Sequence, residues 1–169
     1  MNCPFTYNCS TGFCEYDSFY QAEEMQDMVQ KILNKYSKSK CPAPWKIMHW
    51  VSNHIRYMTD MQQFGVLDYW LYPNEVLQTG AEDCEGISFL TASLLEAAGY
   101  NTRVAIGQAP FGYHAWVEFC DDDGNWFVAE ATTGQIYSWE DRDKMGYYPD
   151  LYVGPGPSGC AYPQEVDPF

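Results

Sequence analysis

Three residues in the second half of the chain carry the side chains of a cysteine nucleophile with its base and its orienting acid. They are Cys84, His114 and Glu130. Cys84 comes directly before a strong helical pattern, His114 lies just inside a strand pattern, and Glu130 ends the following strand pattern. An imidazole that takes the proton of a thiol, while a carboxylate orients the imidazole, activates such a nucleophile. The trio therefore predicts nucleophilic chemistry at Cys84.

The position of Cys84 at a helix start favours its thiolate. A helix N-terminus carries roughly half a positive charge and N–H groups without partners. We expect the thiol pKa to lie below that of a free cysteine, with a protonated His114 lowering it further and the Cys84 N–H available to an oxyanion. A single cysteine at a helix start is more often a small buried side chain, so the interpretation depends on all three residues together.

The histidine and the acid are expected to meet across a β-hairpin. Residues 115–119 and 126–130 read as strands on either side of the Asp-rich segment 121–125, which is interpreted as the turn rather than as a calcium loop. If the two strands pair, His114 and Glu130 lie within a residue or two of being directly opposed. Cross-strand neighbours have Cβ atoms roughly 5 Å apart, which suits a hydrogen bond between imidazole and carboxylate.

The elements that position these residues are helices first and strands later. Apolar residues at helical spacing predict three helices, over residues 21–38, 44–57 and 84–98. Asp83 is the expected N-cap of the third helix and Gly99 its C′ residue. Strand patterns follow, over residues 102–107, 115–119, 126–129 and 135–137. Helices followed by antiparallel strands predict an α+β fold.

The remaining segments are expected to be irregular. Residues 1–20 are interpreted as a lead-in held by cysteines, and residues 59–82 as a long loop with one helical turn at 73–77. The Pro- and Gly-rich tail from residue 149 is expected to be extended.

The charge balance of the chain excludes two classes of partner. Its 23 Asp and Glu residues against 9 Lys and Arg residues give a net charge of −14. Nucleic acids and anionic membranes are bound by basic faces, so we expect neither. The length of 169 residues and the apolar fraction of 46% indicate one folded domain. No apolar run is long enough for a membrane span, and the first residues lack a signal-peptide pattern.

The other cysteines leave three alternatives open. Besides Cys84 the chain has six: Cys3, Cys9, Cys14, Cys41, Cys120 and Cys160. An even number suits three disulfides, free buried thiols are the second alternative, and zinc is disfavoured because no Cys-x2-Cys spacing occurs. Disulfides are favoured, and they indicate an extracellular or surface setting.

Several segments, taken together, resemble the transglutaminase-like superfamily of papain-like thiol enzymes. They are residues 47–58 (IMHWVSNHIRYM), 69–77 (YWLYPNEVL), 83–85 (DCE) with 90–100 (LTASLLEAAGY), 114–118 (HAWVE) and 130–133 (EATT). The resemblance extends over residues 45–137. It implies a core helix bearing Cys84 at its N-terminus, an antiparallel sheet bearing His114 and Glu130, and acyl transfer through a thioester.

Three positions depart from the family pattern. Glu130 replaces the usual Asp, and its extra methylene still allows it to reach the histidine. Glu82 and Gly86 replace the Gly and the Asp that usually surround the nucleophile motif. Gly86 in the first helical turn lowers helix propensity but leaves room near the cysteine.

The chain is most similar to the microbial transglutaminase-like cysteine peptidases, which include enzymes that cut surface proteins or the isopeptide bonds of pseudomurein. No cofactor is required, but some of these enzymes bind calcium through acids that flank the cysteine. Asp83 and Glu85 occupy those positions, where a helix cap and a partner of the helix dipole are the simpler interpretation. Trp70 and Tyr113 are candidates for the substrate cleft. Core packing is the alternative for Trp70, and strand alternation places Tyr113 on the opposite face from His114.

We therefore predict a single domain over residues 1–169. A core at 45–137 is flanked by a Cys-rich and helical extension, 1–44, and a Pro- and Gly-rich extension, 138–169, which are expected to carry substrate choice. The predicted activity is that of a thiol hydrolase of peptide or isopeptide bonds with a Cys-His-Glu triad. The alternatives are a protein-glutamine acyltransferase that forms cross-links and a catalytically silent binding or structural module.

The predicted partner is a protein or peptide substrate, with no nucleic acid and no membrane span. The chain is expected to be a monomer. An extracellular, surface or virion-associated setting is favoured over the cytoplasm.

Overall fold

The computed structural model of the chain describes residues 6–9, 12–154 and 160, with side chains from residue 18 onward. Its helical segments are η1 Tyr16–Phe19, η2 Glu23–Met25, α1 Gln26–Lys35, α2 Ala43–His54, α3 Asp60–Phe64, α4 Pro73–Thr79, α5 Cys84–Ala97 and η3 Trp139–Asp141. Its strands are β1 Thr6–Cys9, β2 Gly12–Glu15, β3 Arg56–Tyr57, β4 Ala81–Glu82, β5 Thr102–Ala109, β6 Gly112–Cys120, β7 Trp126–Glu130, β8 Gln135–Ser138 and β9 Tyr148–Val153.

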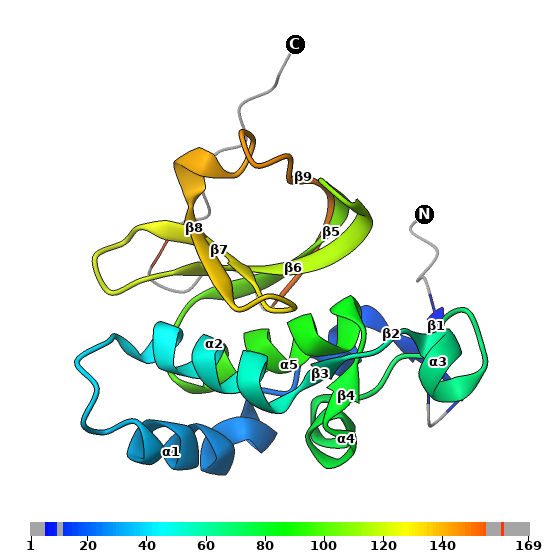
Figure 1. Ribbon diagram of the computed structural model, residues 1–169, viewed down its shortest axis with the longest axis horizontal. Helices are drawn as coiled ribbons and strands as arrows, with labels where there is room; N and C mark the ends of the chain where they lie inside the picture. Colours follow the sequence, from blue (N-terminus) through cyan, green and yellow to red (C-terminus); the bar gives the residue numbers. More distant parts are fainter. Residues whose placement is uncertain (1–5, 10–11, 155–159, 161–169) are drawn as a thin grey trace.

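The α-helices lie beneath one curled antiparallel sheet, as Figure 1 shows. The strand order of the sheet is β8-β7-β6-β5-β9. Helices α2 and α5 lie directly under it, and α1 and α4 form a second helical layer below them (Figure 1). The predicted α+β fold is confirmed. Among the described residues, no helix has both the length and the apolar character needed to cross a bilayer.

Helix α5 is the buried centre of this arrangement. From Cys84 to Leu95 every residue except Glu85 is buried. A helix that is apolar on all sides is stable only when it is covered on all sides, and α5 contacts α1, α2, α4, β5 and β6. Its buried hydroxyl groups are paired, and one of them, Ser88 Oγ, donates to the Ala115 carbonyl oxygen of β6 at 3.1 Å. That bond ties α5 to the strand that carries His114.

The three predicted helices and the predicted hairpin exist with shifted limits. The first predicted helix is an α-helix only from Gln26 to Lys35, and the second ends at His54. Gly99 follows α5 with a φ of 95°, as expected of a C′ residue. Strands β6 and β7 pair with Val117 opposite Ala129, which confirms the hairpin.

The helical turn predicted at 73–77 is confirmed as part of α4, but the rest of the loop predicted over residues 59–82 is wrong. Two helices, α3 and α4, lie in this segment, and β3 pairs with β4 in parallel. Local patterns account for both helices. Thr59 Oγ1 accepts from the Gln62 N–H at 3.3 Å while Gln62 Oε1 accepts from the Thr59 N–H at 3.2 Å, which is a capping box. In α4, Pro73 starts the helix and Glu75 accepts from the Tyr72 N–H at 2.8 Å.

The segments on either side of the predicted core contribute strands and buried side chains that pack with it. The lead-in is not irregular throughout, because β1 and β2 pair as a hairpin within it. Phe19 and Met25 are fully buried in the main core. The tail supplies β9, which pairs with β5 at one edge of the sheet. The described parts of both extensions therefore help to hold the central elements in place.

Candidate active site

Cys84 is the first residue of α5, where the sequence places it. Asp83 is the N-cap, and its Oδ1 accepts from the Glu85 N–H at 3.3 Å. The predicted cap is confirmed. The Cys84 N–H lies in the first turn of the helix, where no intrahelical acceptor exists. Only 8% of Cys84 is exposed, and it is not disulfide-bonded.

His114 and Glu130 meet as the hairpin predicted. Nε2 of His114 lies 2.9 and 3.0 Å from the two carboxylate oxygens of Glu130, and both residues are buried. The contact holds the ring through Nε2 and leaves Nδ1 as the nitrogen not engaged by the acid. The longer side chain of Glu130 therefore reaches the histidine, as expected from the sequence.

Burial by itself would raise the pKa of Glu130, but the hydrogen bond and charge of His114 oppose it and the pKa lies below its ordinary value. Two further donors support the carboxylate. Thr132 Oγ1 donates to Oε1 at 2.6 Å, and the hydroxyl of Tyr147 donates to Oε2 at 3.0 Å. The residue thus remains ionised, which is the state in which it orients an imidazole.

Cys84 and His114 border the same open groove, which has a volume of about 450 Å³. It is lined by Tyr57, Cys84, Phe111, Tyr113, His114, Thr132 and Thr133. Tyr113 is 62% exposed and borders the groove together with His114, although strand alternation had placed them apart. Trp70 does not border it, because its ring is buried between Phe19 and Phe89. The structure thus gives Trp70 the core role that the sequence left as the alternative.

The pKa of Cys84 is raised, which contradicts the expectation drawn from its helix position. Burial is the main cause, followed by the negative charges of Glu85 and Asp83. The thiol donates to Glu85 Oε2 at 3.1 Å, and a carboxylate acceptor of this kind favours the protonated thiol. The helix N-terminus does not offset two adjacent carboxylates and the loss of water.

Carboxyl groups accumulate at the start of α5. Oxygen atoms of Asp60, Glu82 and Asp83 all lie within 4.8 Å of one another, and Asp60 and Glu82 are buried. Asp60 Oδ1 and Glu82 Oε2 accept no hydrogen bond from another group among the described residues, and a proton shared between the two acids or a cation would satisfy both. Burial is the main cause of their raised pKa values, about 7 for Asp60, 9 for Glu82 and 8 for Asp83. Such a set of oxygen ligands fits a hard divalent cation such as Ca²⁺.

Glu82 and Gly86, two of the three departures from the family pattern, are in direct contact and form one structural feature. A Cβ atom added to Gly86 would lie 1.9 Å from Cγ and 2.8 Å from Cδ of Glu82. The Glu82 side chain therefore occupies the space beside the first turn of α5 that only a glycine leaves open. The sequence indicated room at Gly86, and the structure shows that a carboxylate side chain from position 82 fills it.

Sequence reasoning missed three residues of the site. Tyr147 follows η3 and reaches Glu130 only through the tertiary fold, so no local pattern marks it. Asp60 is equally remote from Glu82 and Asp83 in the chain. Thr132 lies two residues after Glu130, where the family pattern also has a threonine, and this similarity was the available indication.

The cysteines only partly follow the prediction. Cys120 and Cys160 form a disulfide that joins the end of β6 to the tail. Cys41 is exposed and free, so the pattern of three disulfides that used all six cysteines is wrong. The side chains of Cys3, Cys9 and Cys14 lie outside the described residues.

Comparisons with known proteins agree with this fold. A sequence model described as the transglutaminase-like superfamily matches residues 26–131. Among solved structures, the chain is similar to Legionella pneumophila LapG in an EGTA-treated and a calcium-bound form. The TM-scores are 0.57 and 0.56 at 18% and 19% identity, over 86% and 84% of this chain and 88% and 93% of LapG.

A candidate cysteine protease from Cytophaga hutchinsonii is also similar, with a TM-score of 0.55 at 20% identity. The match covers 68% of this chain but only 39% of the length of that protein. A search of curated protein sequences finds no match. At these identities the structural similarity concerns the fold.

Gly86→Ala is expected to destabilise the chain by about 1–3 kcal/mol, although alanine is the better helix former, because the new Cβ overlaps Glu82. The double variant Glu82→Gly with Gly86→Ala is expected to regain most of that loss. Denaturant unfolding of the four chains in a double-mutant cycle measures the coupling. Additive effects of the two substitutions would show that the side chains do not compete for one space.

The carboxyl cluster is expected to make the calcium-free chain less stable as pH rises. These acids have folded-state pKa values of about 7, 8 and 9, above the value near 4 of an unfolded carboxyl group. The folded chain therefore binds more protons, and its free energy of unfolding falls with rising pH through this window. Thermal unfolding in EGTA at about pH 5.5 and about pH 8.5 measures the fall.

Glu82→Gln is expected to reduce this pH dependence, because the amide carries no proton that must be lost. The exposed Glu140→Gln is the matched control and is expected to leave the dependence as it is. If Glu82→Gln and the unaltered chain lose stability equally between the two pH values, the buried carboxyl at position 82 is not the cause.

Proposed function

This chain belongs to the transglutaminase-like superfamily, and we propose that it is a thiol hydrolase of peptide or isopeptide bonds that works through a thioester on Cys84. The observation that carries the proposal is the groove bordered by both Cys84 and His114, with His114 held at Nε2 by an ionised Glu130. A nucleophile, a base and an orienter thus come from a helix start and two paired strands, which is the arrangement that a thiol acyl transfer needs.

In the proposed reaction, the Cys84 thiol gives its proton to Nδ1 of His114 and the sulfur attacks the amide carbonyl carbon. The Cys84 N–H, at the start of α5, is placed to stabilise the oxyanion that forms. The protonated His114 then gives its proton to the leaving amine, and a thioester remains. Water, deprotonated by His114, attacks the thioester and releases the acid and the free thiol.

The protonated thiol must turn away from Glu85 before His114 can accept its proton. The contact of 3.1 Å between Cys84 Sγ and Glu85 Oε2 stabilises the thiol in its neutral form. Whatever reduces the negative charge of Glu85 and Asp83 will therefore favour the thiolate. Because these acids lie beside Cys84, the ionisation of its thiol depends on their charge.

Calcium is the proposed cofactor of this site. Asp83 and Glu85, with Asp60 and Glu82 beside them, are the residues that would hold it. When bound, calcium would neutralise carboxylates that now raise the pKa of Cys84. Two observations support the choice: the unpaired buried oxygens of Asp60 and Glu82, and the similarity to a LapG structure that is described as calcium-bound.

Hydrolysis is preferred to transfer because the groove is open to water and nothing in the sequence supplies an amine acceptor site. The silent binding module is the third alternative. A free Cys84 that borders an open groove is the observation against it.

We also propose an oxidising setting outside the cytoplasm, which the Cys120–Cys160 disulfide supports.

The purified chain, loaded with calcium, is expected to cleave amide bonds in a proteome-derived peptide library supplemented with peptides branched at a lysine ε-amine. New termini are identified by mass spectrometry, and Cys84→Ala is the blank. Incorporation of dansylcadaverine into casein tests the transferase alternative with the same pair of chains. Cleavage that persists in Cys84→Ala, or amine incorporation without cleavage, would contradict the proposal.

On a peptide cleaved in that assay, Glu130→Gln is expected to lower kcat by roughly 10⁴-fold because the amide permits the wrong imidazole tautomer. Tyr147→Phe removes one hydrogen bond to the carboxylate and is expected to cost about tenfold. The matched control is Tyr148→Phe, an exposed tyrosine that follows Tyr147 in the chain. A Glu130→Gln variant with the kcat of the unaltered chain would mean that another group orients His114.

Calcium is expected to speed the alkylation of Cys84 by iodoacetamide at neutral pH, because its positive charge offsets the negative charge of Glu85, which holds the thiol in its neutral form. A fall of one pKa unit gives about tenfold more thiolate. The rate is measured by mass spectrometry of the Cys84 peptide in calcium and in EGTA. The exposed Cys41 provides an internal control whose rate is expected not to change.

Glu85→Gln is expected to speed the alkylation in EGTA and to reduce the response to calcium. Equal Cys84 rates in calcium and in EGTA, with Cys41 labelled normally, would remove calcium from the proposal without deciding whether the chain is a thiol hydrolase.

A further inference from the structure

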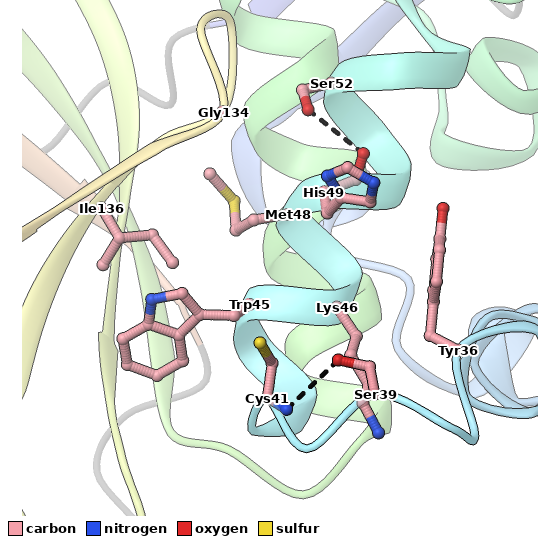
Figure 2. Close-up of a pocket in the computed structure, with 10 residues that line it drawn as sticks. All are labelled: Tyr36, Ser39, Cys41, Trp45, Lys46, Met48, His49, Ser52, Gly134 and Ile136. Carbon is pink, nitrogen blue, oxygen red and sulfur yellow. Dashed lines mark hydrogen bonds between the residues drawn. The ribbon is translucent and has the colours of Figure 1, made fainter.

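A second groove lies beside the candidate active site, across the outward face of α2. It has a volume of about 410 Å³ and is formed by α2, the segment that follows α1, and β8 with the turn before it. Figure 2 shows Trp45, Met48 and Ile136 on one side and Tyr36 on the other, with His49 between them. Its floor is apolar and aromatic, and none of its ten lining residues is acidic.

This groove lies in the basic part of an acidic chain. Residues 28–59 contain six of the nine Lys and Arg residues, two of the three His residues and none of the 23 Asp and Glu residues. Five of those six cationic side chains are exposed, and the sixth, Lys46, lines the groove. Charge of one sign on a groove wall concentrates ligands of the opposite sign. Because the rest of the chain repels anions, this local charge selects where an acidic ligand binds.

Contacts place one further cation, Lys35, beside Tyr36, which lines the groove. Nζ of Lys35 lies 5.6 Å above the ring of Tyr36 and 3.1 Å from Nε2 of His54. The Tyr36 ring packs edge-on against His49, with 5.4 Å between ring centroids. The acidic residues 121–123 line a different hollow, which shares Trp45 with the second groove.

One turn of the chain separates the two grooves. Thr132 and Thr133 border the candidate active site, and Gly134 and Ile136 border the second groove. The turn is pressed against α2, because a Cβ atom added to Gly134 would lie 2.8 Å from both Cβ and Oγ of Ser52. With a φ of 77° at Gly134, the turn has the conformation that favours glycine. A peptide held at Cys84 therefore needs to cross only this turn to enter the second groove.

We propose that the second groove binds an acidic segment of the protein substrate, with an apolar side chain on its floor and carboxylates beside Lys46 and His49. The inference rests on the proposed hydrolase function in so far as the segment belongs to the chain that is cleaved. Charge complementarity favours an acidic ligand, and the turn that borders both grooves favours a segment of the same substrate. The second groove thus adds affinity for substrates with an acidic segment, and it does so away from the bond that is cut.

Binding is measured by fluorescence anisotropy with Cys84→Ala, so that no turnover is needed. The probe is a fluorescein-labelled peptide of about twelve residues, which extends to roughly 40 Å, with a Leu-Phe pair flanked by Asp and Glu. A second peptide carries Asn and Gln at every acidic position. We expect the acidic peptide to bind at least about tenfold more tightly, and its affinity to fall with salt.

Lys46→Glu is expected to weaken binding of the acidic peptide by at least about tenfold, which corresponds to roughly 1.4 kcal/mol. The matched control is Lys144→Glu, an exposed lysine outside the groove, which is expected to change it by less than about twofold. Lys46→Met keeps the length of the side chain and tests the charge if the reversal disturbs α2. Equal affinity of the acidic and amide peptides, or of Lys46→Met and the unaltered chain, would overturn the proposal.

The exposed thiol of Cys41 in the groove provides a test of position. A bromoacetyl group on the acidic peptide is expected to alkylate Cys41, as mapped by mass spectrometry, and the reaction is expected to be lost in Cys41→Ser. Alkylation only at other cysteines would place the peptide elsewhere and contradict the proposal. If the chain forms a concentration-dependent dimer that Lys46→Glu dissociates, the groove is occupied by a second copy of the chain. That outcome would overturn the proposal.

The two proposals fail separately. Peptide cleavage without binding of the acidic probe would overturn only the inference about the second groove. Binding without cleavage of any peptide would overturn the hydrolase and leave the groove as a peptide site. On a peptide that is cleaved, adding the acidic segment is expected to lower KM about tenfold at constant kcat, because the added contacts are equal in the ground and transition states. An unchanged KM would contradict a shared substrate.

Discussion

The packing of α5 against β6 is the constraint on which the candidate site depends. Helix α5 is buried along three of its turns, and Ser88 donates to the carbonyl oxygen of the residue that follows His114. Since Cys84 begins this helix and His114 lies on this strand, one buried interface fixes the thiol relative to the imidazole. The hairpin then brings Glu130 to the other side of the ring. Rigid elements at all three positions are what a preorganised triad requires.

The same burial creates the main electrostatic cost of the structure. Asp60, Glu82 and Asp83 lie together with raised pKa values, and no Lys or Arg forms an ion pair with them within the described part of the chain. The thiol beside them is held in its neutral form by lost hydration and by Glu85. Because acids lie around this thiol, its pKa depends on whatever neutralises them. The Glu82 side chain fills the space that Gly86, which has no side chain, leaves beside α5. The packing of α5 therefore accommodates this cluster.

Charge is distributed unevenly over the molecule, and the distribution follows the elements. The basic segment 28–59 runs through α1 and α2, and the acidic residues lie in the rest of the chain. The turn between β7 and β8 contributes residues to both the candidate active site and the second groove. The same turn supplies Thr132, whose hydroxyl donates to the Glu130 carboxylate.

The sequence by itself determined the fold class, the three main helices, the hairpin and the contact between His114 and Glu130. Helical periodicity, the Asp83 cap and the strand pairing are local properties that a linear pattern records. Tertiary structure decided what depends on distant neighbours: the burial that raises the pKa of Cys84, the approach of Asp60 to Glu82, and the hydrogen bond from Tyr147 to Glu130. It also placed Trp70 in the core and formed the second groove along α2, with Lys46 in its lining, because desolvation and cavity shape are set by packing between segments.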